Sequence, residues 1–160
     1  MNIPDTWNSL NEFANWYKLN DYPQMDSVHF VHQTDVSLSI TLFRHKCYQV
    51  EFYIAKPNFL SSKHYHPFEQ LIIFMGGNGQ GRRGVNIDEE TTWVSLNNHV
   101  VGQIQPVLKT TEWHQIKSEQ NGLYFYNCQR WPNENMMSSA VVEYKGISLG
   151  PMHDRIKKSC

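Results

Sequence analysis

Cysteine is scarce in this 160-residue sequence, which contains only Cys47, Cys128 and Cys160. An odd number of widely spaced cysteines without a Cys-x-x-Cys pair argues against a disulfide framework and against a thiolate zinc site. The sequence also lacks the apolar run of about 18 residues that a transmembrane helix needs. The N-terminus lacks the basic-then-apolar pattern of a secretory signal. These absences predict a cytoplasmic protein with no membrane partner.

An excess of charge is absent as well. The 14 basic and 15 acidic residues leave a formal net charge of −1, so the total charge gives no reason to expect a nucleic-acid partner. The sequence shows no alternation of strands and helices, so a parallel sheet is not expected. What is present suits a single folded domain, because 40% of the residues are hydrophobic and 13% are aromatic, and the chain is long enough to bury a core.

One helix is expected near the N-terminus, over residues 6–19. Its apolar residues recur at three- and four-residue spacing, which indicates a single stripe that packs against the outside of a sheet. Asp5 or Thr6 can serve as the N-cap. The stripe comprises Trp7, Leu10, Phe13, Ala14, Trp16 and Tyr17.

The rest of the chain has the texture of β-structure. In residues 36–42, apolar and polar side chains alternate, which indicates a half-buried strand, and residues 47–55 form its return strand. Residues 100–105 are a further strand. The glycine-rich residues 76–81 indicate a turn between two strands, and Asn121-Gly122 indicates a hairpin. About eight to ten short strands are expected in all, which is the pattern of an all-β sandwich or barrel.

Donors suited to a metal ion gather in one stretch of the sequence. His64 and His66 are two residues apart, so on an extended segment both imidazoles point to the same face. Glu69 and Gln70 follow directly, and His114 is a further candidate at the start of a later strand. Two or three histidines with one oxygen donor suit iron, manganese, nickel, zinc or copper. Period 2 alone does not choose between Glu69 and Gln70, because the intervening proline favours a bulge that changes the alternation.

This stretch resembles the first motif of the cupins, small β-barrels with a jelly-roll fold, whose pattern is Gly-x5-His-x-His-x3–4-Glu-x6-Gly. His64 and His66 match the two histidines, Gln70 stands at the next ligand position, and Gly77 matches the closing glycine. The run His-x-His-Pro-x-Glu-Gln is a common cupin variant in which the glutamine takes the ligand position. Asn58 stands in place of the leading glycine.

The second cupin motif is Gly-x5-Pro-x-Gly-x2-His-x3-Asn, and residues 110–116 resemble its core, with His114 as the ligand. Lys109 and Thr111 stand where this motif has proline and glycine, and Ser118 replaces the asparagine. The second motif therefore depends mainly on His114.

The resemblance implies an all-β fold, a cupin-like jelly-roll barrel with the N-terminal helix packed outside. Residues 1–160 form a single domain with a barrel core at residues 36–131 and an irregular C-terminal extension at residues 133–160. His64, His66, Gln70 and His114 would hold a divalent metal ion. The motif spacing favours Gln70, whereas the chemistry of divalent cations favours the carboxylate of Glu69.

The resemblance also implies several possible functions. The leading hypothesis is a metal-dependent enzyme of the dioxygenase, isomerase, epimerase, lyase or decarboxylase type, acting on a small molecule. Glu69, Tyr65 and Glu112 are the candidate catalytic residues. Aromatic-rich walls with few charges suit a partly apolar or sugar-like substrate. The alternatives are a non-catalytic small-molecule or sugar-binding module, and a structural or interaction protein with a degenerate site. Exposed strand edges need covering, which predicts a homodimer.

Overall fold

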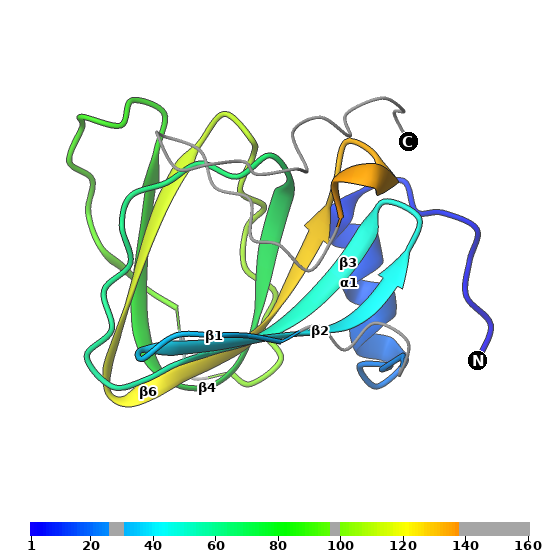
Figure 1. The fold of residues 1–160 in the computed structure, drawn as a ribbon, viewed down its shortest axis with the longest axis horizontal. Coiled ribbons are helices and arrows are strands. Elements are labelled where there is room, and N and C mark those ends of the chain that lie inside the picture. Colours follow the sequence, from blue (N-terminus) through cyan, green and yellow to red (C-terminus); the bar gives the residue numbers. More distant parts are fainter. Residues whose placement is uncertain (26–30, 97–99, 138–160) are drawn as a thin grey trace.

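A computed structural model describes residues 1–25, 31–96 and 100–137 of the chain. The described strands form a six-stranded antiparallel sheet in the order β1-β2-β3-β6-β4-β5. Figure 1 shows the sheet curled around an interior, with the helix α1 outside it. The elements are α1 (Leu10–Leu19), β1 (Val31–Gln33), β2 (Ser37–His45), β3 (Tyr48–Ala55), β4 (Glu69–Gly84), β5 (Val94–Ser95), β6 (Trp113–Arg130) and a short 3-10 helix, η2 (Glu134–Met136).

The helix α1 begins later than predicted. Ser9 is its N-cap, because the Ser9 hydroxyl accepts a hydrogen bond of 3.1 Å from the backbone N–H of Glu12. Asp5, one of the two caps expected from the sequence, forms an ion pair with Lys46 instead. Trp7 lies before the helix, and its carbonyl accepts a 2.9 Å hydrogen bond from the hydroxyl of Tyr48. This contact ties the approach to the helix onto β3.

The main hydrophobic core lies between α1 and the outer face of the sheet, as the helical stripe predicted. Phe13 is fully buried, and its ring centroid lies 4.6 Å from that of Trp7 and 4.9 Å from that of Tyr48. The same cluster contains Leu10, Ala14, Tyr17, Phe43, Val50, Leu71, Ile73 and Cys128. Because these apolar contacts lie outside the barrel, the interior of the barrel is free to be polar.

The glycine-rich residues 76–81 and the Asn121-Gly122 pair lie at a bend in two long strands. The predictions of a turn and of a hairpin at these places were wrong. Residues 76–81 lie within β4, and Asn121-Gly122 lies within β6, which pairs with β4 on both sides of the bend. Gly77 and Gly122 have φ values of +81° and +71°, which glycine adopts readily. A Cβ on Gly77 would lie 2.3 Å from the carbonyl oxygen of Gly122. The glycines therefore let two paired strands turn a barrel corner together.

The described residues form fewer strands than the sequence predicted for the chain. The long β4 and β6 each take the place of two short strands in the prediction. Residues 100–105 are not a strand, and among them Ile104 makes an isolated bridge to Ile73. Most of the expected irregular extension, residues 133–160, lies outside the described residues.

The alternation predicted for β2 is present, and its polar face points into the barrel. Ser39 and Thr41 are 9% and 4% exposed, whereas Leu38 and Ile40 on the other face are partly exposed. The cause is the barrel itself, since its interior is lined by the polar side of β2 while the apolar side faces outward. A strand pattern alone predicts two faces, and closure of the sheet decides which of them is inside.

Cys128 is buried and free, consistent with a small buried hydrophobe. Cys160 lies outside the described residues. The cytoplasmic location stays a prediction. Within the described ranges, no helix has the length and apolar character needed to cross a bilayer.

Candidate metal centre

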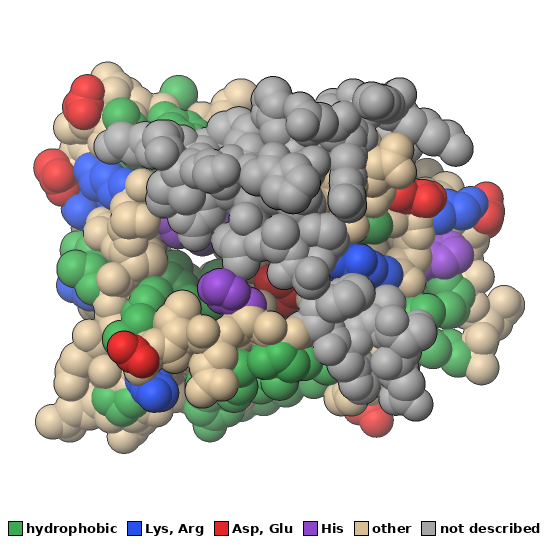
Figure 2. Space-filling model, viewed as in Figure 1, with side chains coloured by type: hydrophobic (Ala, Val, Ile, Leu, Met, Phe, Trp, Pro, Cys, Tyr) green, Lys and Arg blue, Asp and Glu red, His purple; other side chains and the backbone are tan. Residues whose placement is uncertain are grey.

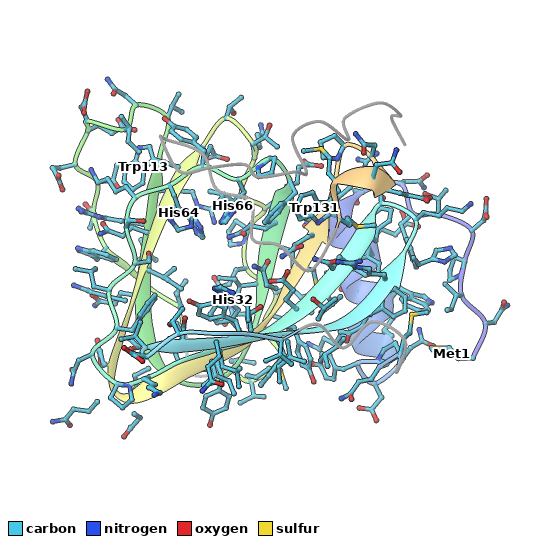
Figure 3. The ribbon with its side chains drawn as sticks, in the orientation of Figure 1. Met1, His32, His64, His66, Trp113 and Trp131 are labelled. Carbon is cyan, nitrogen blue, oxygen red and sulfur yellow. The ribbon has the colours of Figure 1, made fainter. Side chains whose placement is uncertain are left out.

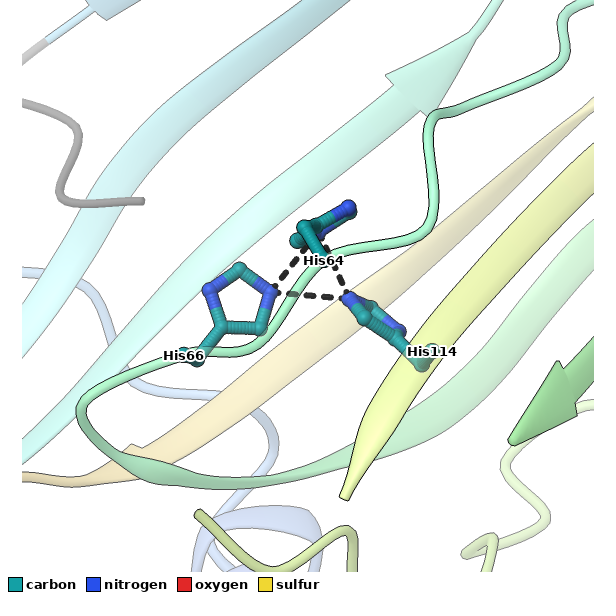
Figure 4. Close-up of side chains that lie close together, drawn as sticks. All are labelled: His64, His66 and His114. Carbon is teal, nitrogen blue, oxygen red and sulfur yellow. Dashed lines mark hydrogen bonds between the residues drawn. The ribbon is translucent and has the colours of Figure 1, made fainter. Parts of the chain in front are cut away.

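Three histidines from separate places in the chain meet in the barrel. His64 lies on the extended segment before β4, and its backbone exchanges hydrogen bonds of 3.1 and 3.0 Å with that of His114, on β6. Directly opposed residues of an antiparallel pair share a face, and His66 is two residues farther along the same segment. The strand geometry thus places all three imidazoles on one side. Figure 3 shows His64 and His66 near each other, and Figure 4 shows both beside His114.

The Nε2 atoms of these histidines form a small triangle. They lie 3.1 Å apart for His64 and His66, 2.8 Å for His66 and His114, and 2.9 Å for His114 and His64 (Figure 4). A neutral imidazole nitrogen carries either one hydrogen or one in-plane lone pair, so three such atoms cannot satisfy one another in a closed ring of hydrogen bonds. A cation that accepts three lone pairs satisfies them all, and nitrogen ligands bind zinc at about 2.0–2.1 Å. The three histidines fit a metal ion.

Two of these histidines have a further contact at Nδ1, the ring nitrogen that faces away from the triangle. The Nδ1 of His64 lies 2.7 Å from the carbonyl oxygen of Ser62 and donates to it, which leaves a lone pair on Nε2. The Nδ1 of His114 lies 3.2 Å from the amide nitrogen Nε2 of Gln70. For Nε2 of His114 to bind a metal, Nδ1 must carry the ring hydrogen and the Gln70 amide must turn its oxygen toward it.

Two histidines of the cluster, His66 and His114, are held in their uncharged form. Burial lowers the pKa of His66 and of His114 well below the ordinary range, and the neighbouring imidazoles lower both pKa values further. The ring of His66 also stacks on Phe68, with centroids 4.5 Å apart. The neutral imidazole is the form that ligates metals.

Gln70, the fourth ligand expected from the motif, is buried beside His114. Its amide contacts Nδ1 of that ring, whereas the ring nitrogen that belongs to the triangle is Nε2. Asn127 donates from Nδ2 to the Gln70 oxygen at 3.4 Å. This placement suits a residue that orients His114, and direct ligation by Gln70 stays a prediction.

The three predicted catalytic residues are engaged outside the histidine cluster. The carboxylate of Glu69 lies 3.8 Å from the guanidinium of Arg130, with which it forms an ion pair. The hydroxyl of Tyr65 donates to the carbonyl oxygen of Val85 at 2.6 Å. Glu112 accepts a 2.9 Å hydrogen bond from a backbone N–H three residues earlier. A catalytic role for any of them stays a prediction.

Comparison with known proteins identifies the fold. No protein-family model and no curated protein sequence matches the chain. Solved structures do match it. A Lactobacillus farciminis oxalate decarboxylase, crystallised as a formate complex, aligns with a TM-score of 0.53 and 13% identity over 66% of this chain and 31% of that one. KdgF from Halomonas sp. aligns with a TM-score of 0.55 and 9% identity, over 72% of this chain and 99% of KdgF.

The capsular polysaccharide assembling protein CapF from Staphylococcus aureus gives a TM-score of 0.56 and 14% identity, over 75% of this chain and 32% of CapF. This chain has the cupin fold. This chain spans about a third of the oxalate decarboxylase and of CapF, and nearly all of KdgF. At these identities the likeness concerns the fold alone.

The cupin barrel encloses a cavity of about 380 Å³, and the histidine cluster lines part of its wall. Figure 2 shows this face of the molecule hollowed, with histidine and acidic side chains at the hollow. His32, an exposed residue of β1, lines the same cavity. Tyr53, on β3, also lines it.

Glu51 is the site residue that sequence reasoning missed. It lines the same cavity from β3, where Ser39 donates to one carboxylate oxygen and Gln49 to the other, each at 3.0 Å. Burial raises the pKa of the Glu51 carboxyl. The signal was present, because Glu51 is the one acidic residue in the alternating strand 47–55, yet the pattern did not say that its face is the inner one.

Proposed function

We propose that this cupin holds one divalent metal ion on His64, His66 and His114 and acts on a small molecule bound in the adjoining cavity. The triangle of Nε2 atoms, 2.8 to 3.1 Å on a side, carries the proposal. The all-nitrogen set suits iron, manganese, nickel, zinc or copper. Gln70 would either orient His114 or join the ligand set, as the motif implies.

The chain supplies the rest of the chemistry. When bound, the ion would act as a Lewis acid toward a substrate oxygen. The barrel wall encloses the substrate and limits its contact with water. Glu51 would hold or release a proton at its carboxylate oxygens, since a carboxyl with a raised pKa keeps its proton to a higher pH than a free one and can then donate it. Among the predicted reaction types, this arrangement favours the isomerase, epimerase and lyase types, in which a proton moves.

Metal analysis tests the first part of the proposal. We expect tag-free protein to contain about one divalent ion per chain, and His64→Ala and His114→Ala to lose it, because each removes a nitrogen from the triangle. His45→Ala is the matched control, since His45 lies 3.2 Å from the carbonyl oxygen of Asp5, outside the cavity. Wild-type protein that takes up no metal from supplemented medium would refute the site.

Turnover tests the second part. A metal-loaded protein that binds small molecules in the cavity and converts none of them supports the alternative, a non-catalytic binding module. Under our proposal, Glu51→Gln abolishes turnover while the metal content stays at the wild-type level. The side chain of Glu51 hydrogen-bonds Ser39 and Gln49, and these contacts involve none of the three histidines.

A further inference from the structure

The inner wall of the barrel is a cross-strand array of polar side chains. The strand register places Thr41 opposite Glu51, and Glu51 opposite Asn127, across β2, β3 and β6. A second row, two residues along, places Gln49 opposite Gln129, which in turn lies opposite Gln70 on β4. Residues in register share a face of the sheet. Polar groups from four adjacent strands therefore cover one patch of the interior.

Such an array is costly unless its groups find partners, because a buried polar atom without a hydrogen bond loses its hydration. Part of the array is satisfied internally. Gln49 donates to Gln129 at 2.9 Å, and Trp131 donates to the same oxygen at 2.9 Å. Asn127, which lines the cavity, has a buried Oδ1 atom for which the described residues supply no partner. The wall thus retains capacity to hydrogen-bond a guest.

The charge on the wall limits what that guest can be. Across the described lining residues there is no lysine or arginine, and Glu51 is the one acidic residue. The nearest cation on this network, Arg44, donates to Gln49 and is not part of the lining. Away from the ion proposed on the histidine cluster, a carboxylate placed against this wall would meet Glu51 and no opposing side-chain cation. A hydroxyl group would meet both donors and acceptors.

The size of the cavity and the shape of its wall also indicate the class of ligand that fits. A volume of about 380 Å³ is at the small end of the range for ligand pockets, about 300–1,000 Å³. Aromatic side chains stand beside the polar array, with Tyr53 stacked on Phe125 at 5.2 Å between centroids and both rings lining the cavity. A polar wall with apolar aromatic faces beside it suits a compact molecule that carries hydroxyls on a carbon framework.

We infer that the ligand of this cupin is an uncharged, polyhydroxylated molecule of about monosaccharide size, whose hydroxyl groups bind the array of Glu51, Asn127 and Gln129. The inference rests on the proposed function in one respect, namely that the cavity beside the histidine cluster is the substrate site. It adds the chemical class of the substrate and the wall that selects it.

Ligand-observed NMR with matched probes tests the inference. Metal-loaded protein is presented with neutral aldohexoses and their alditols, and with the uronates and aldarates of the same carbon skeletons. We expect saturation transfer to at least one neutral probe, and an affinity at least tenfold higher than for its carboxylate counterpart. Transfer to the carboxylates alone, or to no neutral probe, overturns the inference.

Variants localise the binding to the array. Asn127→Ala should weaken binding of the neutral probe about five- to tenfold, the range expected for one lost hydrogen bond. Glu51→Ala should weaken it similarly, and Glu51→Gln less, because the amide keeps the shape and the hydrogen bonds. Glu119→Ala, exposed on β6 and outside the lining, is the matched control. If Asn127→Ala does not fold, Ser39→Ala tests the same wall. Unchanged affinity in these variants also overturns the inference.

Metal content, measured on the same samples, separates this inference from the proposed function. Protein that binds the neutral probe without any metal contradicts the metal site and leaves the ligand class standing. Protein that contains a full complement of metal but binds only the carboxylate probes supports the metal site and contradicts the inferred class of ligand.

Discussion

Glu51 is a carboxyl placed inside the barrel, and its protonation is linked to folding. Burial raises its pKa above the ordinary value of 4.5, while hydrogen bonds from Ser39 and Gln129 and the charges of Arg44 and His32 oppose the rise. The folded chain therefore holds this proton more tightly than the unfolded chain does. By linkage, the contribution of Glu51 to stability is fully present below about pH 4.5 and is lost as the pH rises toward the folded-state pKa.

Glu51→Gln removes this titration, because the amide stays neutral. We expect the free energy of unfolding of the variant, minus that of the wild type, to increase as the pH rises from about 4.5. Urea denaturation at a series of pH values measures the difference. A difference that is constant over the series would show that the carboxyl is not held protonated by its surroundings.

Gln70 tests whether the residue next to His114 orients the ring or binds the ion. Its amide lies 3.2 Å from Nδ1 of His114, so we expect Gln70→Ala to weaken metal affinity about 10- to 100-fold, as loss of an orienting partner does. Competition with a chelator of known affinity measures the effect. A loss as large as that of His114→Ala would instead assign Gln70 to the ligand set.

At the scale of elements, β4 and β6 hold the site because they bend together. Gly77 and Gly122 face each other at the bend with positive φ. We expect Gly77→Ala to destabilise the fold by more than about 2 kcal/mol, since it combines a strained backbone with a clash against a carbonyl oxygen. Chemical denaturation measures this value.

Gly81→Ala is the matched control for the bend. It lies in the same strand, and its added Cβ would meet only the flexible end of Leu96, at 3.1 Å. We expect a change within about 1 kcal/mol for this variant. Equal losses for Gly77→Ala and Gly81→Ala would mean that the bend does not depend on the left-handed conformation.

At the scale of the whole molecule, the sheet has exposed edges. All three residues of the edge strand β1 are exposed, and Val31 is 61% exposed. Edge strands with apolar side chains invite pairing with another chain, so the homodimer stays our prediction. Light scattering should give about twice the chain mass of 18.8 kDa, and Val31→Lys should shift the protein to monomer. A wild-type monomer would contradict it.

Much of the site could be predicted from the sequence because the spacing of His64 and His66 is local. Two residues on an extended segment share a face whatever the fold. The glycines at 77 and 122 were misread because a tight turn and a bent strand both require positive φ, and the local sequence does not distinguish them. Glu51 was missed because alternation defines two faces without saying which is enclosed.

The sequence by itself determined the helical stripe, the strand texture and the histidine pair, since each depends on residues within a few positions of one another. Only the tertiary structure decided that His114 opposes His64, that the serine face of β2 is the inner one, and that Glu51 shares a cavity with the histidines. These facts depend on strand register and barrel closure, which join residues some fifty positions apart. Such contacts come from the packing of the whole sheet, and no local pattern encodes them.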